Sequence, residues 1–328
     1  MGAPARLALY GLILVAVFAA AGVTANAVID EETVQDWMEE APEGLEGQGD
    51  DMNSAGHDDH GADGSSLGLA SAEDGYELTE VAAPSEPGAK GELSLVVTGP
   101  DGSPVTDFDF DHEVEMHLIA VRADGQEFRH GHPERDEAGT WSIPWDWDEA
   151  GTYRVFADFV PSATGEGLTL STLVQVAGDY DPAPAREPVT ETSVDGFDVA
   201  VEGDLIAGEA SQLTVSITRG GEPVTALEPY LGAFGHMVVL RDGDLAYLHV
   251  HPYGDAPEPG DTSGPEIVFE STVPTEGRYL LFLDFQVDGE VHTAPLVVDT
   301  AGGSDTGGGE SSISDGQNEH EEEENHDH

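Results

Sequence analysis

The chain has 328 residues, of which 67 are acidic and ten are basic, so its formal net charge is −57. This charge opposes a compact fold in dilute buffer by self-repulsion, but at molar salt the Debye length falls to about 3 Å. The composition therefore indicates a protein made for brine, as in an extreme halophile, and argues against nucleic acid as a partner, since phosphate binding needs a basic face.

Cysteine is absent from the sequence. Its absence excludes disulfides, thiolate nucleophiles, iron–sulfur clusters and zinc sites built on Cys. It also excludes blue-copper sites, which need a Cys ligand. Any metal site in this chain has to use nitrogen and oxygen ligands.

The chain begins with an apolar segment. Residues 7–29 carry no charge, and they lie between Arg6 and an acidic run that starts at Asp30. A stretch of this length can span a bilayer, and the basic flank on its N-terminal side places the rest of the chain outside the cytoplasm. "ANA" at 25–27 also resembles a signal cleavage site. We therefore expect residues 1–29 to be a signal anchor that holds the protein on the cell membrane, or a signal peptide cleaved near Ala27 that leaves it secreted.

Three segments lack the composition of a folded domain. Residues 30–72 are acidic and rich in Gly and Ser, and residues 301–328 are similar and end in the His-bearing tract "NEHEEEENHDH". Neither can bury much apolar area, so we expect both to be disordered. Residues 180–192 are rich in proline, which favours a semi-extended linker.

A tandem repeat occupies the remainder of the chain. Residues 104–133 align without a gap to residues 223–252, and "GTYRVFADF" at 151–159 matches "GRYLLFLDF" at 277–285. Short alternating runs such as "ELSLVVTG" and "EMHLIAVR" predict strands, and "PDGS", "ADGQ" and "RDGD" predict turns. The expected fold class is all-β, with two immunoglobulin-like β-sandwich domains at residues 73–179 and 193–300.

Two histidine pairs stand at equivalent places in these repeats, in "HGHP" at 130–133 and "HVHP" at 249–252. His130 and His132 are two positions apart on an expected strand, so both side chains face the same side. A two-residue turn at Asp124–Gly125 would set His117 on the neighbouring strand opposite His132, and a turn one residue earlier would set it opposite His130. A three-residue loop would spoil this match.

The same argument gives a trio in each repeat, His117, His130 and His132 in the first and His236, His249 and His251 in the second. Imidazole nitrogen suits zinc and copper(II), and affinity should fall as the pH drops through about 6.5, where imidazole gains a proton. His112 and His292 are secondary candidates for a fourth ligand. The neighbouring Met116 and Met237 should point to the opposite face, into the core.

The stretches "LGAFGHMVVLRDGDLAYLHVHP" and "HLIAVRADGQEFRHGHPERDEAGTWSIPWDWDEAGTYRVFADF" resemble a family of exported tandem β-sandwich proteins associated with heavy-metal handling. Domains of this family are similar to periplasmic copper-resistance carriers. The resemblance implies a copper or heavy-metal role for the six histidines of the trios. The copper carriers use an N-terminal histidine as a ligand, whereas the N-terminus here is the expected membrane segment, so their coordination scheme is not carried over unchanged.

Three functions are compatible with these features. The first is an extracytoplasmic metal-binding protein, for copper or else zinc, that captures, buffers or hands over the ion, with a membrane metal transporter or a cuproprotein as the receiving partner. The alternative is a structural cell-surface adhesion or interaction module, whose histidines are ordinary strand residues. The third is an enzyme with a zinc-bound hydroxide, which the trio could hold. Since no further acid–base pair accompanies the trios, we expect no enzymatic activity.

Overall fold

The structure is a computed structural model that describes residues 67–183, 187–248, 250–254, 256–258 and 260–301, with the backbone alone for His251. By the contacts among its residues the chain divides into residues 1–59 and residues 60–328, and all described residues belong to the second unit. The expected anchor and most of both acidic tails lie outside the described residues. In the part described, no helix is long and apolar enough to cross a membrane.

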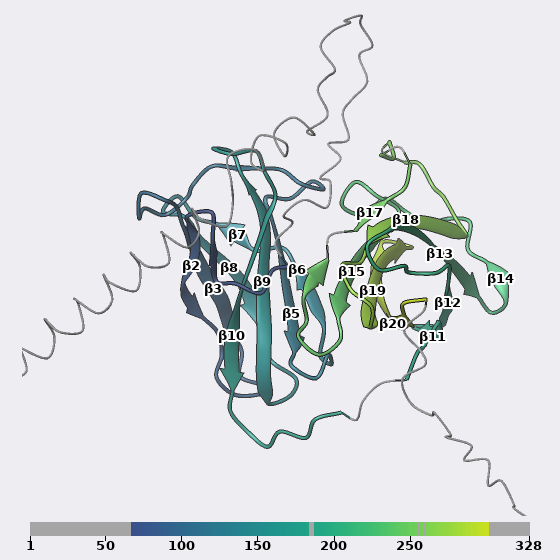
Figure 1. Cartoon of the computed structure of the whole chain (residues 1–328), viewed down its shortest axis with the longest axis horizontal. Helices are drawn as coiled ribbons and strands as arrows, with labels where there is room; N and C mark the ends of the chain where they lie inside the picture. The colour runs from purple at the N-terminus through teal and green to yellow at the C-terminus, as the bar shows by residue number, and fades with distance from the viewer. Residues whose placement is uncertain (1–66, 184–186, 249, 255, 259, 302–328) are drawn as a thin grey trace, which may run out of the picture. The chain divides into compact units, whose positions relative to one another are not determined.

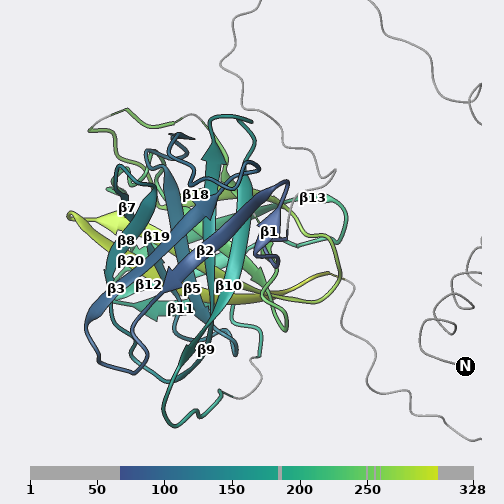
Figure 2. The same cartoon turned by 90° about the vertical axis from the view of Figure 1, so that its left-hand side faces the viewer.

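The first repeat is a sandwich of two antiparallel sheets, with strand orders β1-β2-β3-β8-β7 and β10-β9-β5-β6, and β4 also pairs with β9. Figure 2 shows it from the side of β2, β3 and β10. Its strands are β1 (Ala72–Glu73), β2 (Tyr76–Ala82), β3 (Gly91–Thr98), β4 (Phe108–Asp109), β5 (Met116–Arg122), β6 (Arg129–Gly131), β7 (Glu134–Arg135), β8 (Thr140–Trp145), β9 (Gly151–Pro161) and β10 (Leu168–Val176).

The second repeat forms a second sandwich, with strand orders β11-β12-β13-β18-β17 and β16-β15-β19-β20, and β14 also pairs with β13. Its strands are β11 (Glu191–Val194), β12 (Phe197–Glu202), β13 (Ala210–Arg219), β14 (Glu222–Pro223), β15 (His236–Arg241), β16 (Tyr247–Leu248), β17 (His251–Pro252), β18 (Glu266–Thr272), β19 (Arg278–Val287) and β20 (Glu290–Asp299). The structure confirms the predicted all-β fold of two immunoglobulin-like sandwiches.

Each sandwich has a hydrophobic core of its own, because alternate residues of its strands point inward. Trp141, Trp145 and Trp147 fill the first core, and Phe197, Phe269 and Phe285 fill the second. Met116 and Met237 lie in these cores, as their position beside the first histidine of each trio predicts.

A tyrosine closes the same corner in both repeats. The hydroxyl of Tyr153 donates a hydrogen bond to the backbone oxygen of Glu149 at 2.9 Å, and that of Tyr279 donates to Thr275 O at 2.7 Å. Both tyrosines lie at the same place in the matched segments 151–159 and 277–285. A tyrosine bonded to the backbone a few residues upstream is a mark of immunoglobulin-like sandwiches, so the repeats share local detail as well as architecture.

The two repeats contact each other through the outer faces of β5, β9, β15 and β19. A third apolar cluster there takes equivalent residues from both repeats, among them Ile119 with Val238 and Val121 with Leu240. The ring of Phe128 stacks on Phe282 with centroids 3.9 Å apart, and Phe156 contacts Tyr247 at 5.7 Å. Phe128 and Tyr247 occupy equivalent positions, as do Phe156 and Phe282, so the same patch of each repeat meets that of the other, as in an isologous dimer interface.

Candidate metal centre

The three histidines of the first repeat stand on or beside the β5–β6 hairpin. The strands pair Leu118 with Gly131 and Ile119 with His130. Continuing this register by one pair sets His117 opposite His132, which is the arrangement expected for a turn at Asp124–Gly125. The histidines therefore lie on the face of β5 that looks away from the core of the first sandwich, the same face as Ile119.

The turn that produces this register differs from the predicted one. Arg122 N donates to Gln126 O at 2.8 Å and Gly125 N donates to Arg122 O at 2.7 Å, which closes a three-residue loop with Gly125 at φ 72°. Such a loop alone would shift the pairing by one residue. Glu127, with φ 53°, is an additional irregular residue that shifts it back. The three histidines thus share one face because the three-residue loop and the irregular residue Glu127 together restore the register.

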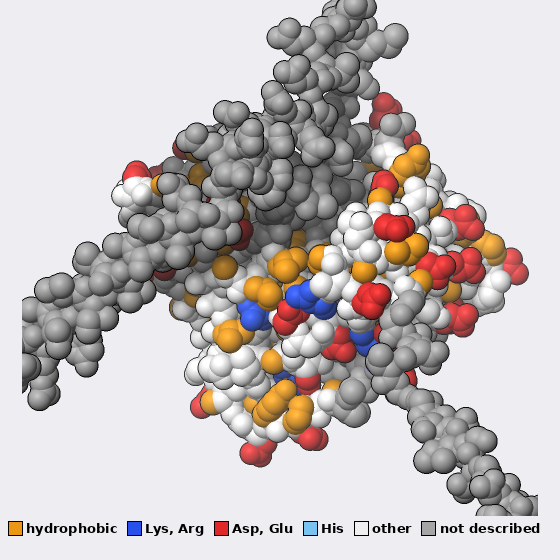
Figure 3. All heavy atoms as spheres, viewed as in Figure 1, with side chains coloured by type: hydrophobic (Ala, Val, Ile, Leu, Met, Phe, Trp, Pro, Cys, Tyr) orange, Lys and Arg blue, Asp and Glu red, His pale blue; other side chains and the backbone are white. Residues whose placement is uncertain are grey.

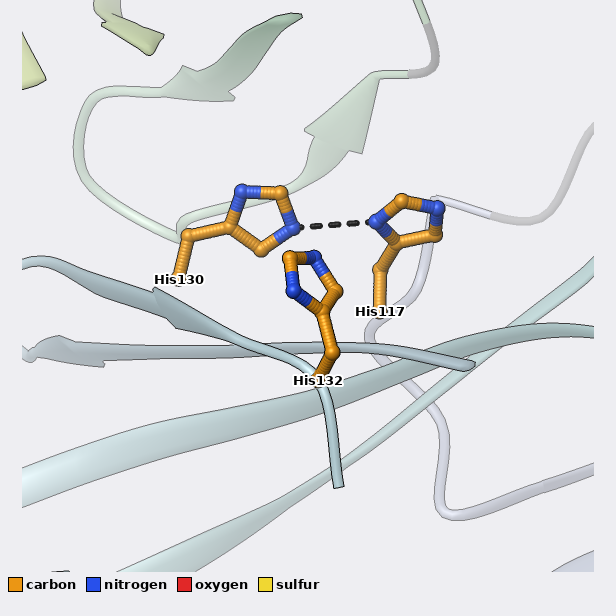
Figure 4. A group of neighbouring side chains, drawn as sticks. All are labelled: His117, His130 and His132. Atoms are coloured by element: carbon orange, nitrogen blue, oxygen red, sulfur yellow. Dashed lines mark hydrogen bonds between the residues drawn. The ribbon is translucent and has the colours of Figure 1, made fainter. Parts of the chain in front are cut away.

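The three imidazoles converge. One ring nitrogen of each of His117, His130 and His132 lies within 4.8 Å of the others, and His117 Nδ1 is 3.0 Å from His130 Nε2. Figure 4 shows the three rings turned toward one another. Two nitrogen ligands of one tetrahedral ion at about 2.1 Å are about 3.4 Å apart. The rings therefore need only small movements to share an ion.

A carboxylate from the second repeat orients His130. Its Nδ1 lies 2.8 Å from Asp284 Oδ2, and both side chains are 4% exposed. The other carboxylate oxygen, Oδ1, accepts a hydrogen bond from Thr293 Oγ1 at 2.5 Å. A neutral His130 that donates from Nδ1 keeps its lone pair on Nε2, which faces His117. A carboxylate behind a ligating imidazole is the usual means of fixing its tautomer and raising its basicity.

His132 supplies the observation that favours an ion most directly. Its Nε2 is buried and has no hydrogen-bond partner among the described residues. A buried polar atom without a hydrogen-bond partner lowers the free energy of unfolding by about 1–3 kcal/mol. A metal ion at the centre of the trio would satisfy the lone pair of this nitrogen, so the residues present fit a site with three imidazole ligands.

Burial keeps His117 and His132 neutral. Desolvation, together with the repulsion that a protonated His117 would meet from a protonated His130, lowers the pKa of His117 to about 2. Desolvation and His130 also lower the pKa of His132 to about 4. Because only neutral imidazole binds metal, protons should begin to compete at these histidines well below the pH of about 6.5 expected for free imidazole.

The cluster is larger than the trio, since two further histidines adjoin it. The ring of His236, from the second repeat, lies 5.9 Å from that of His117 and 4.6 Å from that of His112. Desolvation and His112 lower the pKa of His236 to about 4, and its Nε2 is 3.0 Å from Leu231 O. Sequence reasoning assigned His236 to a separate second site, whereas the structure places it beside the first.

The second hairpin departs from the expected trio. Its strands pair Val239 with Leu248, which would set position 251 opposite His236 if the pairing continued. Instead β16 ends at Leu248, and His251 pairs with Glu270 of β18 in the other sheet. His249 and the side chain of His251 lie outside the described residues. The backbone of the second repeat therefore does not repeat the arrangement of the first.

His292 faces another part of the second repeat. Its ring packs against Phe197 and Phe285, and its Nδ1 lies 2.9 Å from Asp195 Oδ2. It pairs with Phe285 on β19, one position along from the pair formed by Asp284 and Thr293, so it points to the opposite face of the sheet from Asp284. His292 therefore does not supply a fourth ligand, whereas His112 lies next to the cluster.

Sequence reasoning missed Asp284. The residue stands in the matched segments "VFADF" and "LFLDF", whose shared aspartates are Asp158 and Asp284. A carboxylate between aromatic residues on a strand that is otherwise apolar was the available signal. Its relevance depends on contact with His130, 154 positions away in the chain, which local pattern does not reveal.

Comparisons with known proteins bear on the family of the chain. Similar solved structures include the adhesin InvE of Yersinia pseudotuberculosis, at 14% identity over 67% of this chain and 57% of that one, with a TM-score of 0.21. Invasin, a bacterial integrin-binding protein, is 13% identical over 69% of this chain and 38% of that one, with a TM-score of 0.20. Domains 4 and 5 of the S-layer protein SbsC are 12% identical over 69% of this chain and 96% of that one, with a TM-score of 0.21. With TM-scores of 0.20 to 0.21, these likenesses carry no argument about this chain.

No curated protein matches the chain. A family model described as a domain of unknown function, DUF8832, matches it twice, at residues 70–178 and 192–302. That description names no metal, so the copper link implied by the resemblance stays a prediction. The two matches cover both sandwiches and the histidine cluster, and the chain belongs to the DUF8832 family, with two copies of its domain.

Proposed function

We propose that this chain is an exported tandem β-sandwich protein that binds a copper or zinc ion through His117, His130 and His132. The observation that carries the proposal is a trio of buried or half-buried histidines whose ring nitrogens lie within 4.8 Å of one another, in which the buried His132 Nε2 has no partner among the described residues. Ligands of this type suit zinc and copper(II), and the strongly negative chain attracts cations.

The arrangement supports binding more than turnover. The trio packs beside an apolar cluster of buried residues, and a pocket in the described part of the chain lies elsewhere, lined by Asp195, Phe197 and His292. A substrate at a zinc-bound hydroxide would need access and an acid–base partner. Capture, buffering or hand-over of the ion to a membrane transporter or a cuproprotein needs a path for the ion but no space for a substrate and no acid–base partner.

A structural module of the cell surface is the second candidate. Hydrogen bonds already join His117 to His130 and His130 to Asp284 without an ion, and a sandwich fold by itself implies no metal. Under this alternative the histidine cluster is a polar network that fixes the packing of the repeats. The buried nitrogen of His132 is the feature that this reading leaves unexplained.

The test is titration of the full chain with Cu(II) and with Zn(II) in high salt, by calorimetry and by elemental analysis after dialysis. We expect His130→Ala/His132→Ala to lose about one tightly bound equivalent, because two of three ligands are removed. His292→Ala is the matched control, since it removes one buried histidine outside the cluster and leaves the acidic tails unchanged. Equal binding by the double variant and the wild type, with both folded by circular dichroism, would favour the structural module.

A further inference from the structure

The proposed metal ligands and the group that orients them come from different repeats. His117, His130 and His132 belong to the first repeat, and Asp284, which holds His130 Nδ1 at 2.8 Å, belongs to the second. His236, also from the second repeat, lies with its ring 5.9 Å from His117. The centre is therefore complete only when the two sandwiches are in contact.

The contact around Asp284 has a counterpart related by the repeat. Asp158 Oδ1 accepts a hydrogen bond from Thr169 at 2.8 Å, and its Oδ2 accepts one from Tyr247 of the second repeat at 3.0 Å. Asp284 likewise accepts a hydrogen bond from Thr293 of its own repeat on Oδ1 and one from His130 of the other repeat on Oδ2. Each repeat thus presents one buried aspartate to the other, and only one of the two bonds reaches a candidate metal ligand.

We propose that metal binding and the association of the two repeats are coupled, so that the ion tightens the contact between the sandwiches. The inference rests on the proposed function. Carboxylates that hold a ligating imidazole typically change metal affinity by about 10–100-fold. Binding free energies are reciprocal, so whatever factor the second repeat adds to metal affinity, the metal adds to the affinity between the repeats.

The linker makes this coupling measurable. Each sandwich has its own hydrophobic core, and described residues 179–183 lie between them, after the last strand of the first repeat. A specific protease site inserted between Asp181 and Pro182 of the full chain allows the folded protein to be cut. The cut protein then separates into two halves on dilution, and fluorescence from a dye on one half reports their dissociation constant.

With zinc sulfate we expect the dissociation constant of the halves to be about 10–100-fold lower than with a chelator, in the same salt. Asp284→Ala should remove most of this metal effect, and Asp284→Asn, which keeps a hydrogen-bond acceptor for His130, should remove less. Asp195→Asn is the matched control, because Asp195 pairs with His292 outside the cluster, and it should keep the full effect.

Zinc bound by the cut protein is measured in parallel by equilibrium dialysis. If zinc binds at the trio but the dissociation constant of the halves is unchanged, the coupling is wrong and the proposed function stands. If wild type and the His130→Ala/His132→Ala variant bind the same amount of zinc, the proposed function fails and the coupling with it. A metal effect that survives in Asp284→Ala would show that the coupling does not pass through Asp284.

Discussion

Acidification from pH 6.5 to pH 4.5 should lower the free energy of unfolding of the metal-free protein, because buried histidines resist protonation in the folded state. His132 and His236 have pKa values lowered to about 4 and His117 to about 2, whereas unfolded histidine titrates near 6.5. Below pH 6.5 the unfolded chain therefore binds protons that the folded protein does not. Since the unfolded state then carries more protons, stability falls as the pH falls.

The size of this effect follows from the proton balance. Each histidine that is protonated only on unfolding contributes up to about 1.4 kcal/mol of lost stability per pH unit. The loss continues to about pH 4 for His132 and His236 and to lower pH for His117. Protonation of unpaired carboxylates opposes it near pH 4, because it relieves repulsion, so the window from 6.5 to 4.5 isolates the histidines.

Urea unfolding at fixed molar NaCl, followed by tryptophan fluorescence, measures this dependence without changing ionic strength. His132→Gln and His236→Gln should each flatten the slope, and His292→Gln is the control outside the cluster. A stability that stays constant between pH 6.5 and 4.5 would contradict neutral burial of the cluster. Saturating zinc should add stability at pH 6.5 and keep most of that gain down to about pH 4, because His117 and His132 of the folded protein stay unprotonated until then.

A second large effect is expected from salt, with the melting temperature rising by about 10 °C or more between dilute buffer and molar KCl. A gain of about 3–5 kcal/mol produces a shift of this order in a protein of this size. The net charge of −57 supplies the repulsion that salt screens. Figure 3 shows acidic side chains spread over the visible described surface, with the few basic ones close to acidic ones.

Salt screens attractive ion pairs as well as repulsion between carboxylates, so the sign of its effect on the melting temperature depends on which of the two is larger. Six arginines of the described residues contact a carboxylate, namely Arg122, Arg129, Arg135, Arg219, Arg241 and Arg278. Exposed pairs such as Arg219–Asp288 contribute up to about 1 kcal/mol each, whereas the Arg122–Asp124 pair is buried. Because the chain has 67 acidic residues and ten basic ones, screening should remove more repulsion than attraction.

Differential scanning calorimetry across a KCl series checks this expectation, with NaCl at equal ionic strength as the control. Screening predicts the same rise with both salts. A melting temperature that does not change with salt would show that the acidic excess does not limit the stability of the sandwiches. The acidic residues would then serve solubility or act only in the tails.

Much of the fold follows from local sequence. Alternation of apolar and polar residues predicts the strands, and the gapless match of residues 104–133 to 223–252 predicts that the fold is duplicated. Both signals are local because side chains of a strand alternate with a period of two. The same periodicity places His130 and His132 on one face and Met116 in the core.

Other features depended on contacts that local pattern does not specify. His117 meets the His130–His132 pair because the irregular residue Glu127 compensates a three-residue loop, so one residue more or less would turn the imidazoles apart. In the second repeat the chain crosses to the other sheet by His251, because β17 pairs with β18. Equivalent sequences thus give different sites, since long-range pairing decides which sheet a short strand joins.

The composition of the cluster was decided by the packing of one repeat on the other. The sequence by itself determined the strands, the duplication, the acidic character and the placing of His130 and His132 on one face of a strand. Only the tertiary structure brought Asp284 to His130 and His236 to His112 and His117, because these residues meet through the outer faces of two separate sheets. Periodicity shows that the outer face of each sheet is apolar. Which other surface packs against that face depends on shape and charge across the whole interface.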